Sequence, residues 1–327
     1  MKIFITGGAG FIGAVLAKKL VDLGDEVVVY DSFVNFISPF KSHYSDYVKH
    51  RFIGYEDKVK FIRGDIRNKD RLLHALMDQK PDVVVQLAAL PIATTSDDLT
   101  EEATEINLNG TINILEAIKH KASVKRFIYT SSSMIYGDFE YIPADEKHST
   151  KPKGVYGATK LSGEILTKAF CKMYDKEFVI IRPSAVYGPT DANRRVSQIF
   201  VENALAGKPL ILHNGGESRL DFTYIEDIAD GFLLAIKKPE AANQIFNLTR
   251  GEGRSLKELA EILKKHIPDL VIEFGEVKQD EKRPERGALG IQKARDLLGY
   301  SPKYSLEEGI AKYVEFIKQT GVIKKEQ

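Results

Sequence analysis

Tyr156 and Lys160 lie four residues apart, a spacing that places both side chains on one face of a helix. A tyrosine has an ordinary pKa of about 10, so it is a poor base at neutral pH unless nearby positive charge stabilises the phenolate. The Lys160 ammonium can supply that charge. The pair is therefore a candidate acid/base, although the same spacing is also common for two side chains on a helix surface.

A glycine-rich stretch at residues 6–13, with the sequence TGGAGFIG, follows an apolar run and opens a helical pattern. In this context its first glycine permits a tight turn, its second lets the backbone approach a pyrophosphate, and its third lets helix and strand pack closely. The phosphates would lie at the positive end of the helix. The stretch predicts a dinucleotide site with contacts from Gly7, Gly10, Phe11, Ile12 and Gly13.

Asp31 ends the second predicted strand, about 20 residues after the glycines, where such sites place an acid. Its carboxylate can accept hydrogen bonds from the adenosine ribose hydroxyls. It would also repel a 2′-phosphate. We therefore expect the cofactor NAD in preference to NADP.

The first half of the chain alternates short β-branched runs with helical patterns, which predicts an α/β protein with a Rossmann-type, doubly wound parallel sheet. The predicted strands are 2–6, 26–30, 59–63, 83–87, 126–130 and 178–182; the predicted helices include 13–23, 69–78 and 106–120. After residue 185 the pattern loosens, with a helix over 256–266, a strand over 270–274 and a helix over 306–319. We expect an NAD-binding domain over 1–184, rejoined by about 215–245, and a smaller substrate-binding lobe mainly over 185–327.

Composition excludes several classes of function. The 327 residues include 47 Lys plus Arg against 46 Asp plus Glu, so no charge excess favours nucleic acid or an anionic membrane, and we expect neither partner. The one cysteine, Cys171, leaves no internal disulfide and suits a reducing, cytoplasmic location. We find no signal peptide, no apolar run of about 18 residues and no histidine spacing typical of a metal site.

With these features in place, the chain resembles the extended short-chain dehydrogenase/reductase family, the group of NAD-dependent sugar-nucleotide epimerases and dehydratases. The resemblance covers nearly the whole length. Besides the glycine-rich stretch and the Tyr156/Lys160 pair, it rests on Gly64-Asp65-Ile66-Arg67, Leu87-Ala88-Ala89, Asn107 with Gly110-Thr111, Ser131-Ser132-Ser133 before Tyr136-Gly137, and Arg182-Pro183 with Val186-Tyr187-Gly188-Pro189.

The resemblance implies a role for each matching residue. Tyr156 would be the acid/base, Ser132 would bind the substrate oxygen and share in the proton relay, and Lys160 would also bond the nicotinamide ribose. The further residues of the implied NAD site are Asp65 and Ile66 at the adenine, Leu87, Ala88 and Ala89 along the dinucleotide, Asn107, and Pro183 and Ser184 near the nicotinamide.

The implied reaction is oxidation of a nucleoside-diphosphate sugar to a 4-keto sugar, with hydride passing to NAD. Family members that remove water across C5 and C6 carry an Asp-Glu pair where this chain has Ser133-Met134, so 4,6-dehydration is disfavoured. Epimerisation at C4 fits best. Net C4 oxidation and keto-sugar reduction stay open, as does a non-catalytic NAD-binding sensor.

The substrate half departs from the family pattern. Ala185 stands where an asparagine is usual, and Leu220 stands where an arginine is usual. We expect Arg219 and Arg283, with Arg194 or Arg286, to hold an anionic group of the substrate. The family commonly forms homodimers through helices matching 106–120 and 156–173, and we expect the same here. Residues 33–55 receive no predicted role.

Overall fold

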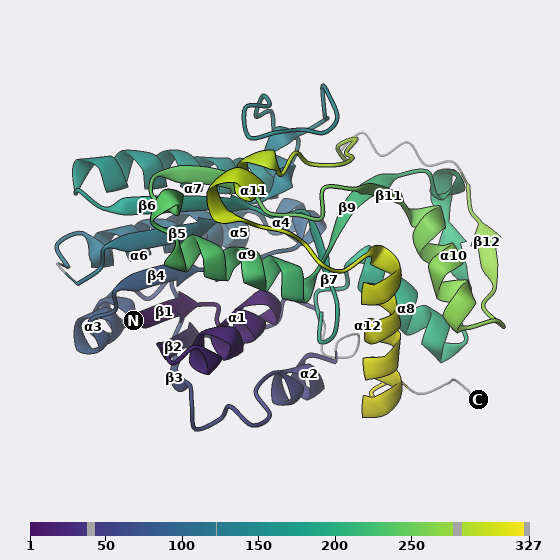
Figure 1. Ribbon diagram of the computed structural model, residues 1–327, viewed down its shortest axis with the longest axis horizontal. Helices are drawn as coiled ribbons and strands as arrows, with labels where there is room; N and C mark the ends of the chain where they lie inside the picture. The colour runs from purple at the N-terminus through teal and green to yellow at the C-terminus, as the bar shows by residue number, and fades with distance from the viewer. Residues whose placement is uncertain (38–42, 122, 277–282, 324–327) are drawn as a thin grey trace.

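Runs rich in Val and Ile form a seven-stranded parallel sheet with the strand order β10-β6-β5-β4-β1-β2-β3 (Figure 1). This computed structural model describes residues 1–37, 43–121, 123–276 and 283–323. Helices cover both faces of the sheet, so its central strands are buried along their length. The strands are β1 (Lys2–Thr6), β2 (Glu26–Asp31), β3 (Lys60–Arg63), β4 (Val83–Gln86), β5 (Arg126–Thr130), β6 (Glu177–Arg182) and β10 (Gln244–Asn247).

The helices divide between the two faces of this sheet and a second lobe. They are α1 (Phe11–Asp22), α2 (Tyr44–Arg51), α3 (Lys69–Gln79), α4 (Ala93–Asp98), α5 (Thr100–Thr104), the π-helix η2 (Glu105–Asn109), α6 (Gly110–Ile118), α7 (Val155–Met173), α8 (Val196–Ala206), α9 (Ile225–Lys237), α10 (Leu256–His266), α11 (Gln292–Leu298) and α12 (Leu306–Thr320), with short 3-10 helices η3 (Ser133–Tyr136), η4 (His213–Gly216) and η5 (Pro239–Ala241). Helices α1 and α9 pack on one face, and α3, α6 and α7 pack on the other. A hydrophobic core lies between the sheet and each of these two sets of helices. Because strand side chains alternate, Ile3 and Ile5 of β1 point into the core on the side of α1 and α9, and Phe4 points into the core on the side of α3, α6 and α7.

The second lobe contains two small sheets and lies beside the carboxyl edge of the main sheet (Figure 1). One sheet has the order β11-β9-β7, and the other pairs β12 with β8. The strands are β7 (Ala185–Tyr187), β8 (Leu210–Leu212), β9 (Arg219–Tyr224), β11 (Gly253–Ser255) and β12 (Ile272–Phe274). Helices α10 and α12 each begin with a capping box, Ser255 with Glu258 and Ser305 with Glu308, which satisfies their first N–H groups.

The chain passes between the lobes several times. Strand β7 follows β6 after two residues, and α9 then returns to pack on α1. Strand β10 adds to the main sheet beside β6, with Phe246 opposite Ile181. Within the described part of the chain, no helix combines the length and apolarity that crossing a membrane requires.

The predicted fold class is confirmed, and the six predicted strands all occur with shifts of one residue at some ends. Strand β10 was not predicted. The predicted helix over 106–120 begins as a π-helix, η2, and continues as α6.

Candidate active site

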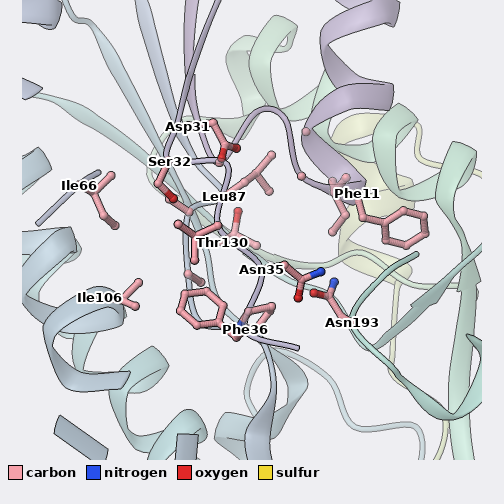
Figure 2. Close-up of a pocket in the computed structure, with 18 of the residues that line it drawn as sticks. Phe11, Asp31, Ser32, Asn35, Phe36, Ile66, Leu87, Ile106, Thr130 and Asn193 are labelled. Atoms are coloured by element: carbon pink, nitrogen blue, oxygen red, sulfur yellow. The ribbon is translucent and has the colours of Figure 1, made fainter. Parts of the chain in front are cut away.

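A deep pocket lies at the carboxyl edge of the main sheet and is lined by residues of both lobes (Figure 2). Its lining follows the strand order: Asp65 comes after β3, Asp31 ends β2, Leu87 comes after β4, Ser132 after β5 and Pro183 after β6. Neighbouring strands lie about 4.8 Å apart, so β2 and β5 are separated by about 14 Å. The pocket, of about 1330 Å³ including its open mouth, therefore suits a long ligand that lies across the strand ends.

The glycine-rich loop forms the middle of the pocket. Gly7 has a φ of +69°, and a Cβ there would come within 2.4 Å of the Ala88 backbone nitrogen, so this turn requires glycine. Helix α1 begins at Gly10 with no side-chain cap and no acidic residue in its first turn. Its first N–H groups thus stay available for a pyrophosphate, which fits a dinucleotide. The predicted residues Gly7, Gly10, Phe11, Ile12 and Gly13 all line the pocket.

Asp31 lies where an adenosine ribose would fit. Its carboxylate accepts a hydrogen bond from the Ala9 N–H at 2.9 Å and another from the Phe33 N–H at 2.7 Å, one on each oxygen. Each oxygen keeps a lone pair that can accept from a ribose hydroxyl. Burial raises the pKa of Asp31, and its two backbone hydrogen bonds oppose that rise.

An apolar cluster closes this end of the pocket. Ile66, Ile106 and Phe36 lie around it in Figure 2, beside Asp65, whose carboxylate pairs with Arg67 at 2.7 Å. Flat apolar walls beside a polar group suit a purine ring. Asp65 and Ile66 were predicted here, whereas Phe36 was not, because it belongs to the segment 33–55, of which 38–42 lie outside the described residues.

Tyr156 and Ser132 both line the opposite end of the pocket. Tyr156 stands in the first turn of α7, and Ser132 caps η3 by accepting from the Met134 N–H at 3.2 Å. Burial raises the pKa of the Tyr156 phenol; the positive charge of Arg195 and a hydrogen bond with Ser132 lower it, but by less. The two hydroxyls are thus placed to pass a proton between them.

Lys160 lies one helical turn after Tyr156. Its ammonium donates to the Thr130 carbonyl at 2.9 Å and lies 5.8 Å from the centre of the Tyr156 ring. Burial lowers the pKa of Lys160 to about 8. In this structure, the neighbours that lower the pKa of Tyr156 are Arg195 and Ser132, and the expected effect of Lys160 on the phenol stays a prediction.

The loop over residues 188–195 contributes pocket residues that sequence reasoning missed. Asn193 and Arg195 line the pocket, whereas Arg194, which was predicted, lies 3.9 Å from Glu202. Thr190 and Arg194 have φ values of 70° and 52°, and each such conformation costs about 1–3 kcal/mol in a residue other than glycine. These turns decide which of two adjacent arginines faces the pocket, and nothing in the residue pattern signals them.

Besides Arg194 and Arg286, three further predicted residues lie outside this pocket. Asn107 is buried, accepts from the Leu90 N–H at 2.8 Å, and so ties the loop after β4 to the helices. Arg219 is exposed and donates to the Gly253 carbonyl at 2.8 Å, and Arg283 is also exposed. The remaining predictions, Ile66, Leu87, Ala88, Ala89, Pro183 and Ser184, all line the pocket.

Arg286 is an unusual side chain in the second lobe. Its Nε is buried and has no hydrogen-bond partner among the residues that the structure describes. Burial, together with the positive charge of Arg283, lowers the pKa of the Arg286 guanidinium to about 10. A buried donor without an acceptor is costly, so this guanidinium is suited to bind an anion.

Arg219 lies close to the segment that carries Arg286. The Gly253 carbonyl binds Arg219, and a Cβ at Gly253 would come within 3.0 Å of the Ala288 nitrogen. The pairing of β7 with β9 shows where Arg219 lies relative to the pocket. The two strands are parallel, and Ala185 of β7 lies opposite Phe222 of β9. The chain just before Phe222, which includes Arg219, therefore lies at the same end of the pair as Ser184.

Comparisons with known proteins found a matching family and similar sequences. Residues 3–249 match the family model of the NAD dependent epimerase/dehydratase family. UDP-glucose 4-epimerase of Mycolicibacterium smegmatis is 32% identical over 325 residues, which cover 97% of this chain and 99% of that protein.

Solved structures are similar over nearly the whole chain. The UDP-glucuronic acid 4-epimerase from Bacillus cereus, in complex with UDP-glucuronic acid and NAD, matches with a TM-score of 0.88 and 32% identity, covering 98% of this chain and 99% of that one. The UDP-glucose 4-epimerase from Thermotoga maritima, with UDP-glucose, matches with a TM-score of 0.87 and 28% identity, with the same coverage.

The buried ammonium of Lys160 predicts a pH-dependent stability in the protein without cofactor. Its pKa is about 8, against an ordinary 10.5. Between these two pH values the unfolded chain binds a proton that the folded chain does not, so the free energy of unfolding rises with pH. Below about pH 8 both states are protonated, and the full cost of burying the charged ammonium destabilises the folded protein. We expect the unfolding temperature of the wild type to rise relative to that of Lys160→Met from about pH 7 to about pH 10. If the difference in unfolding temperature between the two proteins stayed constant over this pH range, the lowered pKa of Lys160 would be contradicted.

Proposed function

Because the chain belongs to the NAD-dependent epimerase/dehydratase family, we propose that it inverts the configuration at C4 of the sugar in a UDP-sugar, through a transient 4-keto sugar. The observation that carries the proposal is that Ser132, Tyr156 and Lys160 line one end of a pocket suited to a dinucleotide, together with Pro183 and Ser184. Similar proteins include 4-epimerases of UDP-glucose and UDP-glucuronic acid.

The proton chemistry belongs to Tyr156. As a phenolate it takes the proton of the sugar C4 hydroxyl, and as a phenol it returns that proton when the keto group is reduced from the other side. Ser132 donates to the same sugar oxygen and relays the proton. Bound NAD⁺ supplies the hydride acceptor and then the hydride donor. Since burial raises the pKa of Tyr156, the positive charges of Arg195 and Lys160 must favour the phenolate in the complex.

The lining offers no second acid and base beside Tyr156. Among the described residues that line the pocket, the carboxylates are Asp31 and Asp65, which follow β2 and β3 at the opposite end. Ser133 is buried and bonds the Ser184 hydroxyl at 3.3 Å, and Met134 carries no ionisable group. Elimination of water needs such a pair, so the arrangement supports epimerisation rather than dehydration.

We assign the substrate diphosphate to Arg219, Arg283 and Arg286. Phosphate oxygens pair best with guanidinium groups, and Arg286 has a buried nitrogen that needs an acceptor. The position of Arg219 at the Ser184 end of the β7–β9 pair supports a substrate that extends from Tyr156 into the second lobe.

We also propose that two copies of the chain pair through α6 and α7. Ile112 of α6 and Ile165 of α7 are exposed large apolar side chains on these helices. Covering them in an interface removes apolar surface from water.

The proposed reaction is tested by incubating the protein and NAD with UDP-glucose and, separately, with UDP-glucuronic acid. We expect the C4 epimer of at least one sugar to form with no net rise in NADH absorbance, since hydride returns to the same sugar. Lasting NADH with a keto sugar would instead establish net oxidation. No reaction and no binding of either compound would refute the proposal.

Replacing Tyr156 by Phe removes the acid/base but leaves the ring. We expect Tyr156→Phe to lower kcat by about 100- to 10,000-fold, while calorimetry still detects NAD binding. Tyr55→Phe is the matched control, because its hydroxyl contacts Asp22 and lies outside the pocket lining. Full activity of Tyr156→Phe would show that another group carries the proton.

Replacing Arg286 by Met should have opposite effects on stability and on binding. Without ligand, the variant loses a buried N–H donor that has no acceptor among the described residues, and it should unfold at a higher temperature. Calorimetric titration with UDP should show at least about tenfold weaker binding, since a charge-assisted hydrogen bond is lost. Arg295→Met, an exposed arginine of α11, serves as the control. Unchanged UDP affinity would remove Arg286 from the diphosphate site.

The proposed interface is tested by light scattering. We expect the wild type to have the mass of a dimer and Ile165→Glu to have that of a monomer, because a buried charge at the interface is costly. A wild-type protein that stays monomeric at high concentration would contradict this pairing.

A further inference from the structure

Arg51, the last residue of α2, links the two lobes through the pocket wall. Its side chain is 3% exposed. The guanidinium donates to the Ala9 carbonyl at 2.8 Å and, through another nitrogen, to the Thr190 carbonyl at 2.7 Å. One rigid fork therefore joins the glycine-rich loop of the main sheet to the loop over residues 188–195 of the second lobe.

On one side, Arg51 acts on the part of the pocket that suits a dinucleotide. Ala9 is held from two directions, since its N–H donates to Asp31 and its carbonyl accepts from Arg51. The positive charge of Arg51 also lies close enough to Asp31 to oppose the rise of that carboxyl's pKa. A ligand that orders the glycine-rich loop and hydrogen-bonds Asp31 therefore also fixes the position of the Ala9 carbonyl, to which Arg51 donates.

On the other side, Arg51 holds a loop that does not adopt its shape by local preference. Thr190 is β-branched and has a φ of 70°, and such a conformation persists only where neighbours impose it. Arg51 contacts both the carbonyl and, at 3.4 Å, the hydroxyl of Thr190. The residue after Thr190 is Asp191, whose buried carboxylate also attracts the positive charge of Arg51.

The same loop carries side chains to the Tyr156 end of the pocket. Asn193 and Arg195 line the pocket, and Arg195 is the charged neighbour that lowers the pKa of Tyr156. The Asn35 side chain donates to the Ala192 carbonyl at 3.3 Å, and Figure 2 shows Asn35 and Asn193 pointing toward each other. A shift of this loop would thus move Arg195 relative to Tyr156.

We propose that Arg51 is a positioning residue that couples occupation of the dinucleotide part of the pocket to the placement of the loop over 188–195, and so of Arg195 beside Tyr156. The coupling requires two carbonyls of two different loops to be bound through two separate nitrogens of one rigid fork, a geometry that the single nitrogen of a lysine side chain does not reproduce. The proposal goes beyond C4 epimerisation and requires only that NAD binds.

Amide hydrogen exchange with and without saturating NAD tests the coupling. In the wild type, NAD should slow exchange over residues 7–13 and, by about tenfold, over residues 188–195. In Arg51→Lys, which keeps the charge, the effect over 7–13 should remain while that over 188–195 falls below about twofold. Arg51→Gln, whose shorter side chain carries one donor nitrogen in place of the fork, should give the same pattern. If only one of the two variants folds, that variant alone decides the outcome.

Arg295→Lys is the matched control, because it makes the same exchange at an exposed position of α11 and should behave as the wild type. Three results would overturn the proposal: no effect of NAD over 188–195 in the wild type, an undiminished effect there in the Arg51 variants, or an equal loss over 7–13 and 188–195. The last result would make Arg51 a support of the glycine-rich loop alone. The measurement needs no turnover, so it stands apart from the test of the sugar reaction.

Steady-state kinetics with whichever UDP-sugar is turned over gives a second readout. Because the loop over 188–195 carries Arg195, which acts on Tyr156, Arg51→Lys should raise the KM for the UDP-sugar by about tenfold and change the Kd for NAD by less than about threefold. A purely structural defect would lower the amount of active protein and leave both constants unchanged, a result that would contradict the proposal.

Discussion

The arrangement depends on one constraint of parallel sheets, that all strands end at the same edge. Asp31, Ser132 and Pro183 are far apart in the sequence, yet they line one pocket because each follows the end of a parallel strand. The strand order, not the chain order, then decides which residue meets which part of a ligand. The intervening strands keep the acid at Asp31 and the hydroxyl of Tyr156 at opposite ends of the pocket, so the proposed ribose site and the proposed acid/base lie apart.

Burial opposes charge at several positions that serve the proposed reaction. It raises the pKa of Tyr156, lowers that of Lys160 to about 8, and lowers that of Arg286 to about 10. In the free protein, the surroundings of these three groups therefore disfavour the charged forms that the proposed reaction needs, namely the Tyr156 phenolate, the Lys160 ammonium and the Arg286 guanidinium. Ligands of complementary charge would reverse this balance, and part of their binding energy is spent in doing so.

The sequence predicted those parts of the molecule whose cause is local. The glycine-rich loop, the strand ends at Asp31 and Ser132, and the Tyr156 helix follow from short patterns with a fixed geometry. Strand β10 could not be predicted, since four residues between a 3-10 helix and a loop become a strand only when β6 is there to pair with them. Likewise, the choice of Arg195 over Arg194 depends on two positive φ values that the fold imposes. Arg51 was missed because a buried arginine at the end of a short, polar helix has no sequence signature.

The return of β10 to the main sheet has a consequence for synthesis of the chain. One edge of β6 has no neighbour until residues 244–247 have emerged, about 60 residues after β6 itself and after β7, α8, β8, β9 and α9. Ribosomes add about 5–20 residues per second, so this edge stays unpaired for several seconds in every nascent chain. An unpaired strand edge can join the edge of another chain. Aggregation of nascent chains during rapid overexpression, and any need for chaperones, should therefore arise while the β6 edge is unpaired. Slower translation before residue 244 would lengthen that time.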